Sequence, residues 1–143
     1  MSSTELVAAL EAVRQALKDA EDALEGQFQA LRTARAEPLV ELTALCSEKI
    51  DAVGLAERTA LETFALLTGP PPRIDALPPE LRPKVVAALT DLRARTAIIA
   101  RKQKRNERAA ELLTQTVQGM SRSLGVEPDR RGFGVAARYG RGR

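Results

Sequence analysis

Few residues in this chain have the type and spacing that catalysis or metal binding would need. The sequence has no histidine and one cysteine, Cys46, which excludes an internal disulfide and a cysteine–histidine metal site. Carboxylates such as Glu11 and Glu62 stand three or four residues from an arginine, a spacing typical of surface ion pairs on helices. Gly69 is followed by prolines rather than by the Lys-Ser/Thr pair of a phosphate-binding loop. We therefore expect no enzymatic activity, no cofactor and no bound metal ion.

A repeating pattern in the last third of the chain is more informative. Apolar residues recur there at steps that alternate between four and three, which is a heptad repeat. The seam consists of Val85, Leu89, Leu92, Thr96, Ile99, Gln103, Asn106, Ala110, Leu113, Val117, Met120 and Leu124. A seam of this length needs partner helices along its whole length, and the chain does not supply enough of them. The pattern therefore predicts that this helix binds another protein.

Two polar residues, Gln103 and Asn106, lie in the middle of this seam and have two interpretations. An asparagine at an inner heptad position fixes the register of packed helices in coiled coils, which would make Asn106 a structural residue. Alternatively, Asn106 makes a polar contact with a bound partner helix. The sequence leaves both interpretations open.

Five basic residues surround Asn106. They are Arg101, Lys102, Lys104, Arg105 and Arg108. A solvated helix face explains them, since Glu107 and Glu111 offset part of their charge. Nucleic-acid binding would be better supported by interleaved aromatic residues or by a wholly basic face. We therefore do not expect nucleic acid as the partner.

The composition is that of a helical bundle. Of the 143 residues, 44% are apolar but only 3% are aromatic, so the core is built from leucine, valine, isoleucine and alanine. No apolar run approaches the ~18 residues of a membrane-spanning helix. The N-terminal residues lack the basic region followed by an apolar one that marks a signal peptide. We expect a cytoplasmic protein without membrane insertion.

The expected fold is all-α, an elongated antiparallel three-helix bundle or coiled coil with a long third helix. We expect helices at about residues 4–33, 38–67 and 80–124, with 1–124 forming one bundle. Pro38 disfavours helical geometry at the residue before it and suits the first turn of a new helix, which predicts a break near residues 34–37. Five prolines and Gly69 make residues 68–79 a linker in which no helix is expected.

Residues 125–143 are expected to form a flexible, disordered basic tail. Five arginines stand there against two carboxylates, so the tail accounts for the whole formal net charge of +3. Its glycines and arginines, together with few apolar residues, cannot bury enough surface to fold. The remaining 124 residues are therefore neutral as a group.

The third helix is expected to be longer than its neighbours. At ~1.5 Å per residue it spans roughly 68 Å, against roughly 45 Å for each of the others. If it folds back on the second helix, its last turns extend beyond both partners and expose an apolar stripe, which usually marks an interaction site. Aspartate at Leu113 and Val117 together is then expected to leave the fold intact and abolish binding. The candidate binding residues are Asn106, Leu112, Leu113, Val117, Met120 and Leu124.

Four local features resemble the FlgN-type flagellar export chaperones. These are small helical proteins that hold hook–filament junction subunits for the flagellar type III exporter. The features are the spacing of Leu39, Leu42, Lys49 and Arg58, the segment Leu-Pro-Pro-Glu-Leu at 77–81, the pair Arg105-Asn106 followed by Leu112-Leu113, and the segment Tyr139-Gly140-Arg141-Gly142.

The resemblance implies how such a protein would work. The C-terminal part of the third helix would capture the cargo, an amphipathic helical segment of an exported hook-associated protein. Tyr139 would dock on a component of the export gate. The alternative is a basic-tailed coiled-coil protein that oligomerises or binds nucleic acid. Ionic strength separates the two, because phosphate binding weakens steeply with salt whereas burial of an apolar seam hardly changes.

Overall fold

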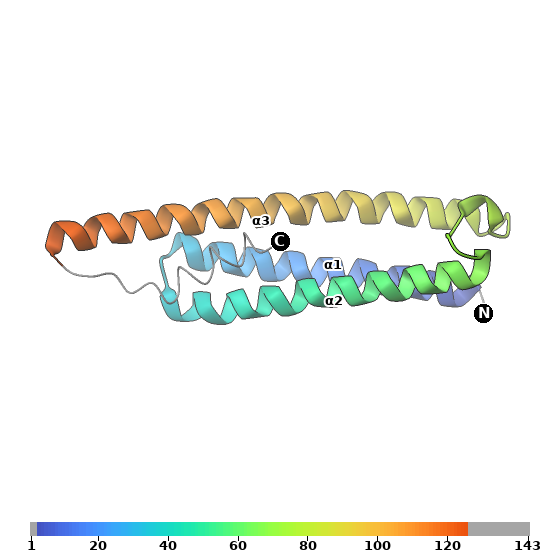
Figure 1. Cartoon of the computed structure of the whole chain (residues 1–143), viewed down its shortest axis with the longest axis horizontal. Helices are drawn as coiled ribbons and strands as arrows, with labels where there is room; N and C mark the ends of the chain where they lie inside the picture. The colour runs from blue at the N-terminus through green and yellow to red at the C-terminus, as the bar shows by residue number, and fades with distance from the viewer. Residues whose placement is uncertain (1–2, 126–143) are drawn as a thin grey trace. The chain divides into compact units, whose positions relative to one another are not determined.

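Three α-helices make up most of the structure, a computed structural model that describes residues 3–125 (Figure 1). Helix α1 spans Ser3–Arg32, α2 spans Ala36–Thr68 and α3 spans Arg82–Leu124. One short 3₁₀-helix, η1, spans Ile74–Ala76, and these 123 positions contain no strand. The predicted all-α class with three helices and a long third one is confirmed. The predicted tail lies outside the described residues from position 126 onward.

The break between α1 and α2 overlaps the predicted residues 34–37 but ends earlier, because Ala36 and Glu37 already belong to α2. The Ala34 N–H donates to the Leu31 carbonyl at 3.3 Å, and the Arg35 N–H donates to the Ala30 carbonyl at 3.2 Å. This pair of bonds is the Schellman motif, in which the residue after the C-cap turns left-handed. Ala34 has a φ of 52°, as the motif requires. Helix α2 then begins at Ala36, so Pro38 lies in its first turn, where a missing N–H costs nothing.

Replacing Ala34 with glycine is expected to raise the free energy of unfolding by about 1 kcal/mol. A left-handed alanine carries a Cβ penalty of roughly 1–2 kcal/mol, and the greater entropy of unfolded glycine offsets part of the gain. Urea unfolding followed by circular dichroism measures the change. Ala36→Gly, in the first turn of α2, is the control and should lower stability. A loss of stability in Ala34→Gly would contradict the turn geometry.

The segment before α3 contains one helical turn that the proline content did not predict. Residues Ile74–Ala76 form η1, and the Arg82 side chain holds the segment in place. Its Nε donates to the Leu77 carbonyl at 3.0 Å and its Nη2 to the Asp75 carbonyl at 2.8 Å. Helix α3 begins at Arg82, slightly later than expected, and Pro83 again falls in a first turn.

The helices contribute to two compact units, each built from parts of α1, α2 and α3. The first unit combines residues 3–20 with Lys49–Ile98, and the second combines Glu21–Glu48 with residues 99–125. The buried apolar residues of the first unit are Leu6, Leu10, Val13, Leu17, Ala20, Ala60, Phe64, Leu77, Leu81 and Val85. Those of the second are Ala23, Leu24, Ala30, Leu31, Leu39, Cys46, Ile99 and Ala110. Apolar spacing of three and four residues on each helix produces both cores.

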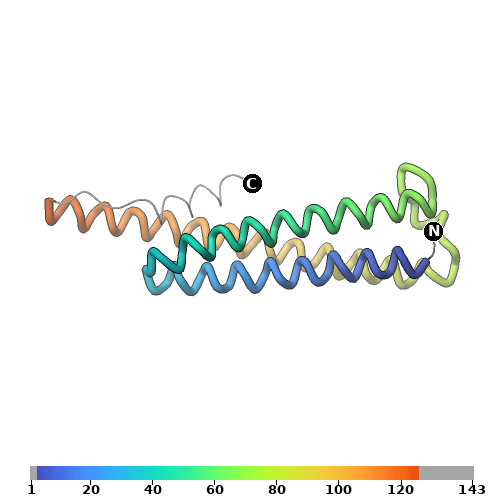
Figure 2. The backbone as a smooth tube through the Cα atoms, turned by 90° about the horizontal axis from the view of Figure 1, so that it is seen from below, coloured from blue at the N-terminus to red at the C-terminus, as the bar shows by residue number. Residues whose placement is uncertain are grey.

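In the second unit, α3 continues past the turn that joins α1 to α2 (Figure 2). Residues on both sides of that turn form a buried cluster with Ala110. The cluster consists of Ala30, Leu31, Leu39 and Ala110, with Leu42, Ala109, Leu113 and Val117 packed against it. The part of α3 without such packing is therefore shorter than the helix lengths alone predict, because Leu113 and Val117 still contact this cluster.

Candidate functional site on helix α3

Asn106 lies at the centre of a buried polar network in the second unit. Its Nδ2 donates to the Leu24 carbonyl and to Gln27 Oε1, both at 2.9 Å. Gln27 Nε2 in turn donates to Thr43 Oγ1 at 3.1 Å. Asn106, Gln27 and Thr43 are each at least 96% buried. The network therefore links α3 to α1 and α1 to α2 through groups that water does not reach.

This network favours the structural interpretation of Asn106. Both amide protons are used within the chain, and Oδ1 accepts a hydrogen bond from Arg105 Nε at 3.1 Å. A buried network of this kind stabilises one register of the helices, since any slip leaves polar groups without partners. A bound partner would have to displace these bonds to reach Asn106. The neighbouring seam residue Gln103 is half-buried.

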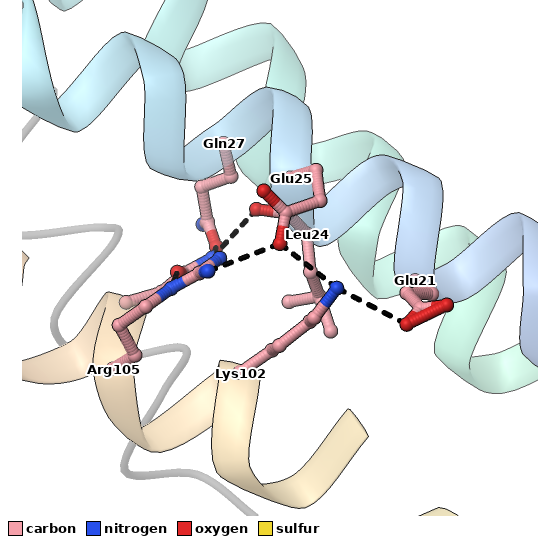
Figure 3. Close-up of polar contacts among 7 residues, drawn as sticks. Glu21, Leu24, Glu25, Gln27, Lys102 and Arg105 are labelled. Atoms are coloured by element: carbon pink, nitrogen blue, oxygen red, sulfur yellow. Dashed lines mark hydrogen bonds and ion pairs between the residues drawn. The ribbon is translucent and has the colours of Figure 1, made fainter. Parts of the chain in front are cut away.

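A layer of charged side chains borders the network (Figure 3). Lys102 and Arg105 extend from α3 toward Glu21 and Glu25 on α1. Lys102 Nζ lies 3.1 Å from Glu21 Oε2 and 2.9 Å from Glu25 Oε1, and Arg105 Nη1 lies 3.0 Å from the same Glu25 oxygen. These hydrogen bonds, that from Lys102 first, lower the pKa of Glu25, and the bond to Glu25 raises the pKa of Lys102.

Arg105 is also held by an aromatic ring. Its Cζ lies 3.8 Å from the centroid of Phe28, within the range of a cation–π interaction, which is worth ~0.5–2 kcal/mol. Its Nη2 is buried and has no hydrogen-bond partner. Arg105 is thus fixed from three sides, by Phe28, Glu25 and Asn106. Arg105 therefore lies between the buried network and the surface of α3, with its side chain 34% exposed.

Sequence reasoning missed most of this arrangement. Gln27 is polar, so apolar periodicity does not mark it as a core residue, although it stands three residues after Leu24 and hence on the same helix face. Glu25 and Phe28 lie about 80 positions from Arg105 in the chain, and nothing in local spacing pairs them. The sequence feature that indicates this arrangement is the basic run around Asn106, an asparagine at an inner heptad position.

The six predicted binding residues fall into two groups. Leu112, Met120 and Leu124 are 64%, 60% and 75% exposed, and are large apolar side chains on the surface. Leu113 and Val117 are half-buried against the cluster at the α1–α2 turn, and Asn106 is buried in the network. Two of the exposed residues, Met120 and Leu124, line a shallow groove on α3, ≈ 400 Å³ in volume. The groove is lined by Gln115, Thr116, Gly119, Met120, Ser123 and Leu124.

The remaining residues named in the sequence analysis lie in different parts of the chain. Cys46 is fully buried in the second unit, and desolvation raises the pKa of its thiol to about 11, so it behaves as a small core residue. Lys49 is half-buried and Arg58 is exposed, both in the first unit. Tyr139 lies outside the described residues. Within residues 3–125, no His, Cys, Asp and Glu side chains gather into a group that could hold a metal ion.

None of the helices in the described part of the chain is both long enough and apolar enough to span a membrane. Comparison with known proteins found no matching family model, no matching curated protein and no matching solved structure.

Proposed function

We propose that this protein is an export chaperone that holds a flagellar hook–filament junction protein and delivers it to the flagellar type III export gate. The observation that carries the proposal is the end of α3, where Leu112, Met120 and Leu124 are exposed beside a well-packed core. Exposed apolar side chains gathered at one helix end are typical of an interaction site. The sequence resemblance to FlgN-type chaperones supplies the identity of the partner.

The energetics suit reversible capture of an amphipathic helix. Burying three large apolar side chains contributes roughly 4–9 kcal/mol. Association costs of ~4–15 kcal/mol offset much of this, so the cargo segment must contribute further contacts. A complex that forms in the cell and is released at the exporter needs such a balance. Cargo binding by helix-in-groove contact uses side chains spaced three and four residues apart, and the exposed Met120 and Leu124 stand four residues apart.

Tyr139 belongs to the proposal through the resemblance alone. We propose that it docks on the export gate, which would separate delivery from cargo holding. The surrounding arginines would speed the encounter with an acidic surface.

The test is a variant that removes the exposed apolar residues without touching the core. Met120→Glu together with Leu124→Glu should leave the melting temperature almost unchanged, because both side chains are more than half exposed. Binding of the purified hook–filament junction proteins should weaken at least about 100-fold, since charged groups cannot enter an apolar contact. Titration calorimetry measures the affinity of the parent and the variant.

The control is Arg122→Glu, which changes the net charge equally at an exposed position at the same end of α3, outside the groove. The control should bind cargo like the parent protein. The mass of the free protein in solution is measured in parallel. If the parent binds no junction protein, or if the Met120 and Leu124 variant binds like the control, the proposal is wrong. A dimer that the variant dissociates would instead assign this surface to self-association.

A further inference from the structure

One face of α3 carries four cations at helical spacing. Arg101, Lys104 and Arg108 stand three and four residues apart, about one turn each, and Arg105 lies beside this row, four residues after Arg101 and three before Arg108. The row leads toward Leu112, one further turn along the helix. It lies in the second unit together with the exposed apolar end of α3.

These cations line a shallow groove. Its wall consists of Arg101, Lys104, Arg105, Arg108, Ala109 and Leu112, and its volume is ≈ 470 Å³. Among residues 3–125, no carboxylate and no aromatic side chain belongs to that wall. Leu112, at the apolar end of the groove, is 64% exposed. The groove therefore combines a basic region with a short apolar one.

Among the described ion pairs, one reaches the cations that line this groove. Arg105 pairs with Glu25, which Lys102 also uses. Within residues 3–125, none of the described ion pairs includes Arg101, Lys104 or Arg108. Like charges three and four residues apart on a helix repel each other. A partner that brings carboxylates to this face would relieve the repulsion.

We propose that the groove binds an acidic helical segment of a partner protein, with its carboxylates over Arg101, Lys104 and Arg108 and apolar side chains over Ala109 and Leu112. The inference rests on the proposed function and specifies which side chains the cargo segment carries. One half of the segment is acidic, and the other half is apolar and continues onto Met120 and Leu124. From Arg101 to Leu124 this surface is roughly 35 Å long, the length of a helix of about 23 residues.

Protein fits the groove better than nucleic acid does. Single-stranded nucleic acids bind through aromatic side chains that stack on bases, and the lining residues of this groove that the structure describes include no aromatic side chain. The apolar pair Ala109 and Leu112 offers nothing to a phosphate backbone. A glutamate-bearing helix, in contrast, presents carboxylates at the same spacing of three and four residues as the cations.

The probe is a synthetic helical peptide of about 20 residues, with glutamates spaced three and four apart in one half and leucines at the same spacing in the other. A fluorescent label reports binding to the full chain by anisotropy. The parent protein should bind this peptide, and a peptide with glutamine in place of every glutamate should bind at least about tenfold more weakly. The affinity for the acidic peptide should also fall as salt is raised.

The decisive variant carries Arg101→Glu, Lys104→Glu and Arg108→Glu. Its affinity for the acidic peptide should fall at least about 100-fold, because three attractive contacts become repulsive. Lys18→Glu, Lys84→Glu and Arg93→Glu change the net charge equally at exposed positions of the first unit and should preserve binding. The melting temperature of each variant is compared with that of the parent. If the triple glutamate variant fails to fold, the same positions are changed to glutamine, and about a tenfold loss is expected.

Three outcomes would overturn the inference. The first is equal binding of the acidic peptide and the glutamine peptide. The second is an equal loss of affinity in the control variant, which would show a general charge effect. The third is that a single-stranded oligonucleotide binds at this face in place of the peptide. Failure of the junction proteins to bind, with the peptide result intact, would overturn the proposed function and leave this groove assigned to an acidic segment of another partner.

Discussion

Replacing Asn106 with aspartate is expected to lower the free energy of unfolding by about 2–4 kcal/mol, the cost of an unpaired charge in a buried polar network. The new carboxylate oxygen would face the Leu24 carbonyl and Gln27 Oε1, both of which now accept a hydrogen bond from Nδ2 at 2.9 Å. Three oxygens without a proton between them repel one another. Arg105 Nε would still donate to the other oxygen, which keeps the loss below that of an isolated buried charge.

Chemical unfolding of the parent and the Asn106→Asp variant measures the difference at each pH. The deficit should shrink in acid, where the carboxyl carries a proton that it can donate to the Leu24 carbonyl. The parent must be measured at each pH as well, because Glu25, whose pKa is lowered by Lys102, contributes stability above its ordinary pKa of 4.5 that is lost as the pH falls through its lower folded-state pKa. Gln115→Glu, at an exposed position of the same helix, is the control and should change stability little.

A deficit below about 0.5 kcal/mol at neutral pH would mean that the site admits water or that the helices shift to relieve the repulsion. Either result would remove Asn106 from the role of fixing the register of α3. The inner position would then be free to contact a partner, as the second interpretation of the sequence holds.

Aspartate at both Leu113 and Val117 is expected to destabilise the fold by about 3–6 kcal/mol, contrary to the expectation from the sequence that the fold would remain intact. Both side chains pack against the cluster of Ala30, Leu31, Leu39 and Ala110 at the α1–α2 turn. Two charges there lose the apolar contact and face a surface without hydrogen-bond partners. Since the second unit is held by this cluster, its part of α3 should detach first.

The matched control is Leu112→Asp, one position away on the same helix. Leu112 is 64% exposed, so its substitution should cost less than about 1 kcal/mol. Urea unfolding of both variants, with hydrogen exchange at the end of α3, provides the comparison. If the double variant is as stable as Leu112→Asp, Leu113 and Val117 are surface residues after all. If it is destabilised, loss of cargo binding in that variant says nothing about the binding surface, and the Met120 and Leu124 variant must decide.

The order and number of the helices follow from local features of the chain. Pro38, the proline-rich segment before α3 and Gly125 with its φ of 71° each act on the backbone within a few residues of themselves. Proline removes an N–H and restricts the preceding residue, and glycine adopts a left-handed conformation without a steric cost. Because these effects act over only a few residues, the sequence alone predicts the three helices.

The left-handed conformation of Ala34 is a feature that the local sequence does not predict. Nothing in the type of this residue favours a positive φ, and glycine would be the usual choice. The geometry of the α1–α2 turn imposes the positive φ of Ala34. The two Schellman hydrogen bonds and the packing of Leu31 and Leu39 outweigh the steric cost of the left-handed conformation.

The site depended on packing that periodicity cannot supply. A heptad pattern says that Asn106, Leu113 and Val117 face inward, but not whether a helix of this chain or of another protein lies opposite them. The hydrogen bonds of Asn106 to Leu24 and Gln27, about 80 positions away in the chain, show that a helix of this chain lies opposite Asn106. The same contacts paired Arg105 with Glu25 and Phe28. Burial depends on both of the surfaces that pack together, so the pattern of a single helix identifies only candidate residues. The packed helices show which of these candidates are covered, and that Leu112, Met120 and Leu124 remain exposed.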